Sequence, residues 1–302
     1  MNRYAPLLLL LAGTWGASYL FIKVAVDDIE PAPMMTARSL LAGVVLFGYL
    51  ALTLGTRRAL ADVTAAWRPV LVLGAINAAI PFWLVAWGVK HVDSGIAAIA
   101  QSTVPIFTLL LALRFLPHER FGPARIAGVC LGLVGVGVLA GFRPEGGWWA
   151  AAGTLAVVLS SISYASAGIY GQLRVRAIAG PVLATGSMLA AGLMLLPLSL
   201  FQLPDGVPSL EATASLLTLT LLGTAMAQLV LYRMLRIFGS PRVSLVTFLI
   251  PGFALFYGAL LLDEPITASA LLGLALILCG VALGSGALRL ARRPAEAPAP
   301  TP

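Results

Sequence analysis

Long apolar segments dominate this sequence and restrict what it can fold into. We count ten, at residues 5–25, 33–54, 69–89, 94–115, 122–142, 148–172, 177–202, 211–236, 240–262 and 266–288. A helix needs about 20 predominantly apolar residues to cross a membrane. A transmembrane strand would instead alternate polar and apolar residues, and these runs are uniformly apolar. The sequence therefore predicts an all-α membrane protein with ten transmembrane helices.

Composition supports this class. Hydrophobic residues make up 60% of the chain and charged residues 10%, whereas about a quarter of a soluble domain is charged. The lipid bilayer is therefore an expected partner. The net charge of +7 could suggest a nucleic-acid partner, but the placement of the charges has another explanation and we expect no such partner.

Basic residues concentrate on one side of the predicted helices. If the N-terminus defines one face, that face holds fifteen of them: Arg3, Arg57, Arg58, Arg68, Arg114, Arg120, Arg125, Arg174, Arg176, Arg233, Arg236, Arg242, Arg289, Arg292 and Arg293. We call it the basic face. The opposite, acidic face holds Asp27, Asp28, Glu30, Asp93, Glu145, Asp205, Glu211, Asp263 and Glu264. Because cytoplasmic loops are enriched in Lys and Arg, both termini are expected in the cytoplasm.

The two halves of the chain repeat a series of landmarks. Pro105 and Glu119 are 14 residues apart, and Pro251 and Glu264 are 13 apart. A glycine follows 9 residues after each glutamate, and a second glycine follows 7 residues later, giving the pairs Gly128 with Gly135 and Gly273 with Gly280. Such ordered recurrence indicates an internal duplication.

The duplication defines three regions: a first five-helix repeat at 1–143, a second at 144–288, and a Pro/Ala-rich tail at 289–302 that we expect to be disordered. Since five is an odd number of spans, the second repeat must enter the membrane from the opposite side. Inverted repeats are a recurrent basis of alternating access in transporters.

With these apolar segments, charge asymmetry and repeated landmarks, the chain resembles the EamA-type family of the drug/metabolite transporter superfamily. The resemblance runs over nearly the whole chain and is densest at 219–283. The first half contributes TWGASYLFIKVA at 14–25, TARSLLAG at 36–43 and SGIAAIAQSTVPIFTLLLA at 94–112. The resemblance implies a ten-helix transporter of the bacterial inner membrane. It also implies export of amino acids, other small metabolites or drugs, without specifying which.

The first helix carries four candidate substrate-binding residues. Trp15, Tyr19 and Lys23 recur at intervals of four, and Ser18 lies three residues after Trp15, so they fall on related faces. Lys23 could attract a substrate carboxylate or pair with an acidic loop residue. It could equally extend its ammonium group to the membrane interface.

Arg38 lies five residues into the second apolar segment. It could reach the interface, or pair with Asp27, Asp28 or Glu30. Alternatively, its guanidinium could clamp an anionic group with two parallel hydrogen bonds, which Lys cannot do.

Other polar and aromatic residues inside apolar segments need either a partner or a water-lined cavity. We expect a substrate-binding cavity to be lined by Asn77, Trp83, Gln101, Tyr164, Gln228 and Tyr232. Aromatic rings beside polar groups suit a small molecule with an apolar side chain. Ordinary helix packing or an interfacial aromatic belt would also explain the aromatic residues.

Two prolines and a glycine series suggest moving and packing elements. Pro105 and Pro251 lie near the middle of equivalent helices, where each could act as a hinge or as a static kink. The glycines of the fifth and tenth helices favour close helix contacts. If those helices meet their counterparts on another chain, the protein is a homodimer, and the sequence leaves this open.

Enzyme chemistry is disfavoured. No Asp or Glu lies in the interior of a predicted span, and His91 and His118 are far apart in the sequence. We therefore expect no metal or other cofactor, and no phosphate-binding loop ending in Gly-Lys-Ser/Thr occurs. A membrane-embedded enzyme acting on lipid-linked substrates is the alternative to a transporter. Without an embedded carboxylate, transport is expected to be facilitative or coupled through an acid at a loop edge, where Glu119 and Glu264 are expected to cap helix starts or pair with arginines.

Overall fold

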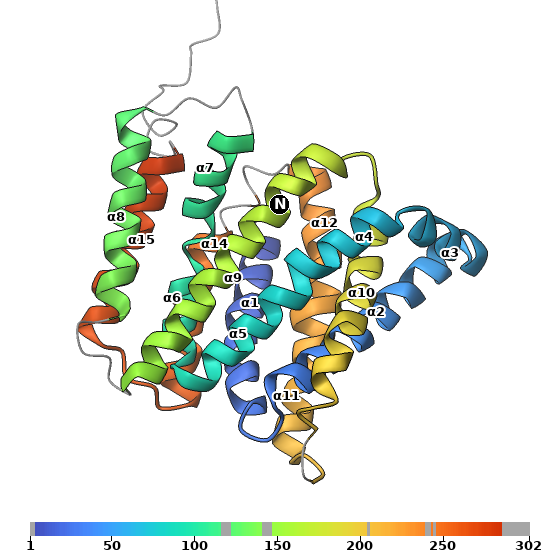
Figure 1. The fold of residues 1–302 in the computed structure, drawn as a ribbon, viewed down its shortest axis with the longest axis horizontal. Helices are drawn as coiled ribbons and strands as arrows, with labels where there is room; N and C mark the ends of the chain where they lie inside the picture. The colour runs from blue at the N-terminus through green and yellow to red at the C-terminus, as the bar shows by residue number, and fades with distance from the viewer. Residues whose placement is uncertain are drawn as a thin grey trace, which may run out of the picture.

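The computed structural model describes residues 4–115, 122–140, 147–203, 206–238, 243 and 246–285, and every regular element within these ranges is helical (Figure 1). The first half contains α1 (Tyr4–Ala25), α2 (Pro31–Leu54), α3 (Thr56–Ala65), α4 (Trp67–Leu73), the π-helix η1 (Gly74–Ala79), α5 (Ile80–His91), α6 (Ser94–Gln101), α7 (Val104–Phe115) and α8 (Pro123–Ala140). The second half contains α9 (Gly147–Arg174), α10 (Gly180–Ser199), α11 (Leu210–Thr220), the π-helix η2 (Leu221–Met226), α12 (Ala227–Phe238), α14 (Val246–Leu261) and α15 (Ala268–Ser285).

Seven helical stretches are long and apolar enough to cross a membrane: Tyr4–Ala25, Pro31–Leu54, Trp67–His91, Ser94–Phe115, Gly147–Arg174, Gly180–Ser199 and Leu210–Phe238. Three further apolar helical stretches are shorter: Ile126–Leu139, Val246–Leu261 and Ala268–Leu283. The prediction of an all-helical membrane protein is confirmed. Val44, Val134, Leu193 and Leu272 are more than half exposed, as expected for side chains that face lipid.

The segment between the second and third predicted spans, at 55–68, is mostly helical. It contains α3, which follows α2 after Gly55 at φ 84°. Ala59 is buried while Arg57, Arg58 and Leu60 are exposed, so the short helix has one packed side. Single glycines tolerate positive φ without strain, which explains the sharp break before α3.

The two prolines predicted as hinges have different surroundings. Before Pro105, the chain leaves the helical conformation at Ser102 and Thr103, between α6 and α7. The Thr103 hydroxyl donates to the Ala100 carbonyl oxygen at 2.7 Å. Pro251 instead lies inside the continuous helix α14. The helix is therefore broken at one proline and continuous through the other.

Two of the spans contain a π-helix in the middle. η1 lies between α4 and α5, and η2 lies between α11 and α12. A π-helix inserts extra residues into the regular hydrogen-bond ladder and is frequently found at functional sites. Neither π-helix was expected from the sequence.

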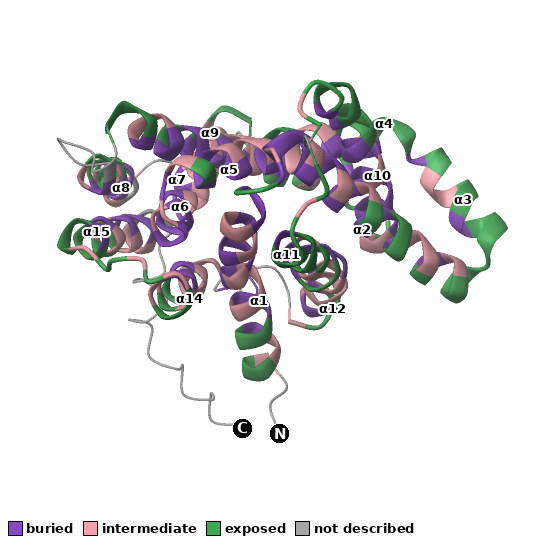
Figure 2. Ribbon diagram, turned by 90° about the horizontal axis from the view of Figure 1, so that it is seen from below, coloured by how far each residue is buried: buried purple, intermediate pink, exposed green. Residues whose placement is uncertain are grey.

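Helices pair across the two halves of the chain. α2 packs against α10, α8 against α15, α5 against α9, and α1 against α14. α8 and α15 lie at one edge of the molecule and α2, α3 and α10 at the opposite edge, with α1 between them (Figures 1 and 2). Buried residues lie mainly where helices face one another (Figure 2).

Glycines bring the paired helices close together. A Cβ on Gly280 would lie 2.5 Å from the Gly128 carbonyl oxygen, and one on Gly135 would lie 2.9 Å from the Ile277 backbone nitrogen. The glycine faces of α8 and α15 therefore pack against each other within one chain. The predicted close packing is confirmed, and these glycines provide no argument for a homodimer.

Candidate functional site

A buried arginine lies between helices from both halves of the chain. Arg38 on α2 is 7% exposed, and its Nε donates to the Thr224 hydroxyl in η2 at 2.9 Å. Its guanidinium carbon lies 4.0 Å from the centre of the Phe82 ring on α5. Its Nη1 also lies 3.6 Å from the Met35 sulfur. The residue thus connects three helices that are distant in the sequence.

Two tyrosines complete this group. Tyr19 on α1 and Tyr164 on α9 are both buried within electrostatic range of Arg38. We call Tyr19, Arg38, Phe82, Tyr164 and Thr224 the Arg38 cluster. It combines one cation, three hydroxyl groups and three aromatic rings, which is a suitable composition for binding a small polar molecule with an apolar portion.

The charge of Arg38 has no carboxylate partner among the residues described. The ion pairs there are Lys90 with Glu30 and Arg58 with Asp62. The pairing with Asp27, Asp28 or Glu30 that the sequence left open is therefore not formed. Arginines inside membrane helices are costly unless they have a partner or serve a function, so this buried guanidinium requires an explanation.

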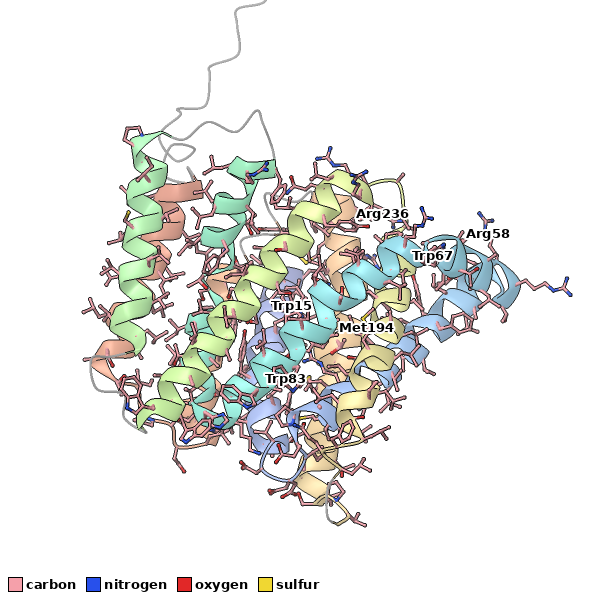
Figure 3. The ribbon with its side chains drawn as sticks, in the orientation of Figure 1. Trp15, Arg58, Trp67, Trp83, Met194 and Arg236 are labelled. Carbon is pink, nitrogen blue, oxygen red and sulfur yellow. The ribbon has the colours of Figure 1, made fainter. Side chains whose placement is uncertain are left out.

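Some polar atoms near this position in the chain also lack partners. The hydroxyls of Thr36 and Ser39, on either side of Arg38, are buried without a hydrogen bond, as is the indole nitrogen of Trp83 beside Phe82. Such orphans are uncommon in folded proteins. Figure 3 labels Trp83 and Trp15, which lie at different levels along the bundle.

The side chain of Gln101 forms hydrogen bonds that join two helices. Its side-chain nitrogen donates to the Ser161 hydroxyl at 3.0 Å, and its side-chain oxygen accepts from the Ser160 hydroxyl at 2.8 Å. Both serines are fully buried on α9. Because both ends of the amide are satisfied, Gln101 fixes the end of α6 to α9.

Asn77 and Gln228 both lie at π-helices. Asn77 is the fourth residue of η1, and Gln228 is the second residue of α12, directly after η2. The Ser163 hydroxyl on α9 donates to the Ile76 carbonyl oxygen of η1 at 2.7 Å. On the other side, a Cβ on Gly223 of η2 would lie 2.7 Å from the Ser18 hydroxyl of α1. A serine of α1 or α9 therefore packs closely against each π-helix.

Trp15 and Tyr232 lie in other packing environments. Trp15 packs with the apolar cluster formed by Leu8, Leu11 and Met234. Tyr232 on α12 packs on Gly180, where a Cβ would collide with its ring. The structure records no contact of either residue with Arg38, and their roles in substrate binding stay predictions.

Lys23 contacts the backbone at the end of α5. Its ammonium group donates to the carbonyl oxygens of Val89 at 3.1 Å and Val92 at 3.0 Å. The last carbonyls of a helix lack partners within the helix and carry partial negative charge, so a lysine stabilises them. The residue also lines a cleft of about 240 Å³ with Asp27, Asp28 and Glu211.

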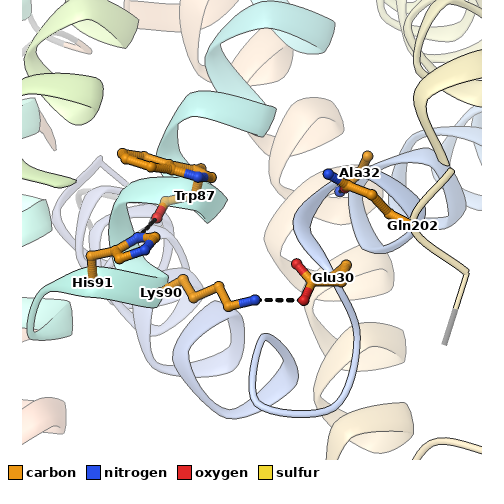
Figure 4. Close-up of polar contacts among 6 residues, drawn as sticks. All are labelled: Glu30, Ala32, Trp87, Lys90, His91 and Gln202. Carbon is orange, nitrogen blue, oxygen red and sulfur yellow. Dashed lines mark hydrogen bonds and ion pairs between the residues drawn. The ribbon is translucent and has the colours of Figure 1, made fainter. Parts of the chain in front are cut away.

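Further contacts join helices at the acidic face. Lys90 pairs with Glu30, and the side-chain oxygen of Gln202 accepts from the Ala32 amide at 3.3 Å (Figure 4). His91 Nδ1 lies 2.8 Å from the Trp87 carbonyl oxygen (Figure 4). The ends of α5 and α10 are thus both connected to the start of α2.

Two carboxylates at this face bind the first residues of other helices. Glu264 accepts from the Ser94 amide at 2.7 Å, the Ser94 hydroxyl at 2.7 Å and the Gly95 amide at 3.2 Å, and so caps α6. Asp28 accepts from the Ser209 amide at 3.0 Å, directly before α11. Hydrogen bonds from the side chain and backbone of Ser209 hold the pKa of Asp28 below its usual value. The predicted capping role of Glu264 is confirmed, and Glu119 lies outside the described residues.

Part of this arrangement was visible in the sequence. Tyr19 and Tyr164 were expected to bind substrate, and both lie within electrostatic range of Arg38. Arg38 itself was visible as a lone arginine inside an apolar segment, but it was not ranked among the binding residues. Thr224 gave no signal, because threonines in membrane helices usually bond their own backbone.

Known proteins resemble this chain over most of its length. The profile of the EamA-like transporter family matches residues 3–141 and again residues 151–286. An uncharacterized transporter of Bacillus subtilis, YoaV, is 26% identical over 88% of this chain and 91% of its own length. The uncharacterized inner membrane transporter YedA of Escherichia coli is 30% identical over 70% of this chain and 68% of its own.

A solved crystal structure of another protein shares the fold. It has a TM-score of 0.66 and 17% identity, and the match covers 97% of this chain and 100% of that one. The sequence profile matches both halves of the chain, and the helical fold, the apolar surface and the relatives all agree with it. The chain is therefore a membrane transporter that belongs to the EamA-like transporter family.

Proposed function

We propose that the chain is a secondary transporter that exports amino acids or other small metabolites or drugs by alternating access. Its two halves, at 1–143 and 144–288, would be inverted repeats of five spans each, giving ten in total. Both termini would lie on the cytoplasmic side of the bacterial inner membrane, as the charge difference between the basic and acidic faces predicts.

The observation that carries the proposal is the reciprocity of the helix contacts. α2 packs on α10 and α8 on α15, and these would be equivalent helices of the two proposed repeats. Exchanging the two halves converts the contact of α5 with α9 into the contact of α1 with α11 and α12, and both contacts occur. The same exchange converts the contact of α1 with α14 into the contact of α9 with α6 and α7, and both of these occur as well. A pseudo-two-fold axis between the halves accounts for all these pairs.

Local features follow the same exchange. Each half has a π-helix inside its third span. Ser18 and Tyr19 of α1 correspond to Ser163 and Tyr164 of α9 at an offset of 163 − 18 = 145, the same as that between Glu119 and Glu264. The family profile also matches once in each half. If two halves can exchange their conformations, the site between them opens to either side in turn.

The contacts at the acidic face support a state closed on that side. Lys23, Lys90, Asp28 and Glu264 each join two segments there. Export would require these contacts to break so that the Arg38 cluster opens outward. Because Glu264 is held by three donors from α6, we expect it to hold the helices together at this face, and we propose that transport is facilitative.

Reconstitution in liposomes tests the function. Purified protein would be assayed for uptake and counterflow of labelled amino acids, with and without an imposed pH gradient. Saturable flux that is unaffected by the gradient is the expected result. Flux driven by the pH gradient would contradict a facilitative mechanism. The absence of saturable flux for every amino acid, cationic drug and other metabolite tested would contradict transport.

A further inference from the structure

We propose that Arg38 binds the carboxylate of the transported molecule, and that the carboxylate replaces the Thr224 hydroxyl as the partner of the guanidinium. This assignment rests on the proposed transport function and specifies its substrate class. The ligand would be a small monocarboxylate with an apolar side chain, such as an amino acid. Thr224 would occupy the position of the ligand while the site is empty.

The first argument is the unbalanced charge. Arg38 is buried, yet its recorded contacts are a hydroxyl, a thioether sulfur and an aromatic ring. Such neutral groups compensate a guanidinium poorly, whereas a carboxylate matches its fork of donors with two parallel hydrogen bonds. Buried charges in membranes are usually paired or serve substrates. An anion that arrives from solution would supply the missing partner.

The second argument is the nature of the surrounding groups. The Arg38 guanidinium can only donate hydrogen bonds, and the Tyr19 and Tyr164 hydroxyls, which lie within electrostatic range of it, can also donate. A site rich in donors favours an acceptor such as a carboxylate. The rings of Tyr19, Phe82 and Tyr164 would contact an apolar side chain. A phosphate ester would bring nearly two negative charges, and Lys23, another cation of these spans, is already bound to backbone carbonyls.

The third argument is asymmetry between the halves. A Cβ on Gly43 would meet Leu189, and a Cβ on Gly192 would meet Leu40. The two contacts correspond to each other if each position in α2 matches the position 149 residues later in α10, since 43 + 149 = 192 and 40 + 149 = 189. The residue equivalent to Arg38 is therefore 38 + 149 = 187, a serine. The packing of α2 on α10 requires no arginine at this position in α10, which favours a role in binding one ligand.

The fourth argument is that Thr224 belongs to a π-helix. Its hydroxyl also lies 3.1 Å from the Leu219 carbonyl oxygen, five residues earlier. When a carboxylate binds the Arg38 guanidinium, the Thr224 hydroxyl loses its hydrogen bond from Arg38, and η2 loses a contact that fixes it to α2. Substrate binding would thereby affect η2, which packs against α1. Each π-helix can return to α-helical hydrogen bonding with a small shift of register.

Binding to the purified protein in detergent tests the proposal without requiring transport. The probes are L-leucine and L-leucinamide, and L-phenylalanine and L-phenylalaninamide, which differ within each pair in the carboxylate. Stabilisation against heat and equilibrium binding of labelled probe would be measured for the wild type, Arg38→Gln and Arg38→Lys. The wild type should bind the acids at least 10-fold more tightly than the amides. Arg38→Gln should abolish this preference, and Arg38→Lys should retain part of it.

Thr224→Val provides the second variant. It keeps the size of the side chain and removes the hydroxyl that competes for Arg38, so the acids should bind about 3-fold more tightly or better. Arg58→Gln is the matched control, because it removes an exposed arginine on α3 and should leave binding unchanged. If Arg38 only braces the helices, Arg38→Gln would affect acids and amides equally and Thr224→Val would not tighten binding. Either result would overturn the proposal.

Flux separates this proposal from the general function. Wild-type flux of the amides or of cationic drugs, combined with no preference for acids, would retain transport and reject the carboxylate site. Preferential binding of acids that Arg38→Gln abolishes, without flux in liposomes, would support the site and contradict transport.

Discussion

The carboxylate of Glu264, in the loop before α15, caps the start of α6 by accepting from both the amide and the hydroxyl of Ser94. These residues are 170 positions apart and belong to different halves of the chain. The contact also passes close to Gly258, where a Cβ would collide with the carboxylate. It is thus one of the points where the acidic face is held closed.

Glu264→Gln should destabilise the protein by about 1–2 kcal/mol, the typical loss for a helix cap whose charge is removed. The amide can accept on one atom only, so a donor of Ser94 or Gly95 loses its partner. Thermal unfolding in detergent would measure the change. Glu211→Gln, at an exposed position on the same face, is the control and should have little effect. An equal response of both variants would reject the cap as the cause.

The link between Asp28 and Ser209 should depend on pH. The folded state lowers the pKa of Asp28, so the stabilisation is fully present above the unfolded value of about 4. It is lost as the pH falls through the lower, folded pKa. Asp28→Asn should therefore melt below the wild type at pH 7, and this difference should shrink below pH 4. A difference that is constant with pH would contradict the assignment.

The close contact of α8 with α15 should not tolerate a methyl group at Gly280. A Cβ there would lie 2.5 Å from the Gly128 carbonyl oxygen and 2.6 Å from the Gly132 nitrogen, both of them backbone atoms. Gly280→Ala should cost about 1–3 kcal/mol through overpacking. Gly137→Ala on α8, with open space around the new atom, should be neutral or stabilising by up to about 1 kcal/mol. Unfolding in detergent compares them, and equal effects would contradict this packing.

Lys23→Gln distinguishes two roles of this lysine. Attraction of a substrate carboxylate was one role that the sequence left open for it, whereas its ammonium group contacts the end of α5 in the structure. If the lysine acts through α5, the variant should change the flux of amino acids and of their amides by the same factor and lower the melting temperature. A selective loss for the acids would favour direct binding. Counterflow in liposomes measures both.

Part of the fold could be predicted because it depends on local composition. A run of apolar residues that is long enough to cross lipid must satisfy its backbone hydrogen bonds internally, so it forms a helix wherever it occurs. The start of α2 at Pro31 and its end before Gly55 follow from the conformations that these residues adopt. The basic residues at 57 and 58 were noticed, but the neighbouring Ala59 and Leu60 did not indicate that the stretch is a helix.

The candidate site could be predicted only in fragments. Tyr19 and Tyr164 were selected as polar aromatic residues inside apolar segments, without any indication that both lie near one cation. The π-helices have no composition that marks them, because glycine, alanine and leucine fill ordinary membrane helices as well. The two predicted hinges looked equivalent in sequence, yet the chain breaks before Pro105 and continues through Pro251.

The sequence by itself determined that the chain is an apolar, helical membrane protein with repeated landmarks and opposite charge on its two faces, since hydropathy and loop charge are properties of each segment alone. The tertiary structure decided which helices pair, that the glycines meet within one chain, and that Arg38 faces Thr224, 186 residues away. Those outcomes depend on the packing of side chains from distant segments. Lipid solvates all apolar faces almost equally, so hydropathy carries no information about which faces meet.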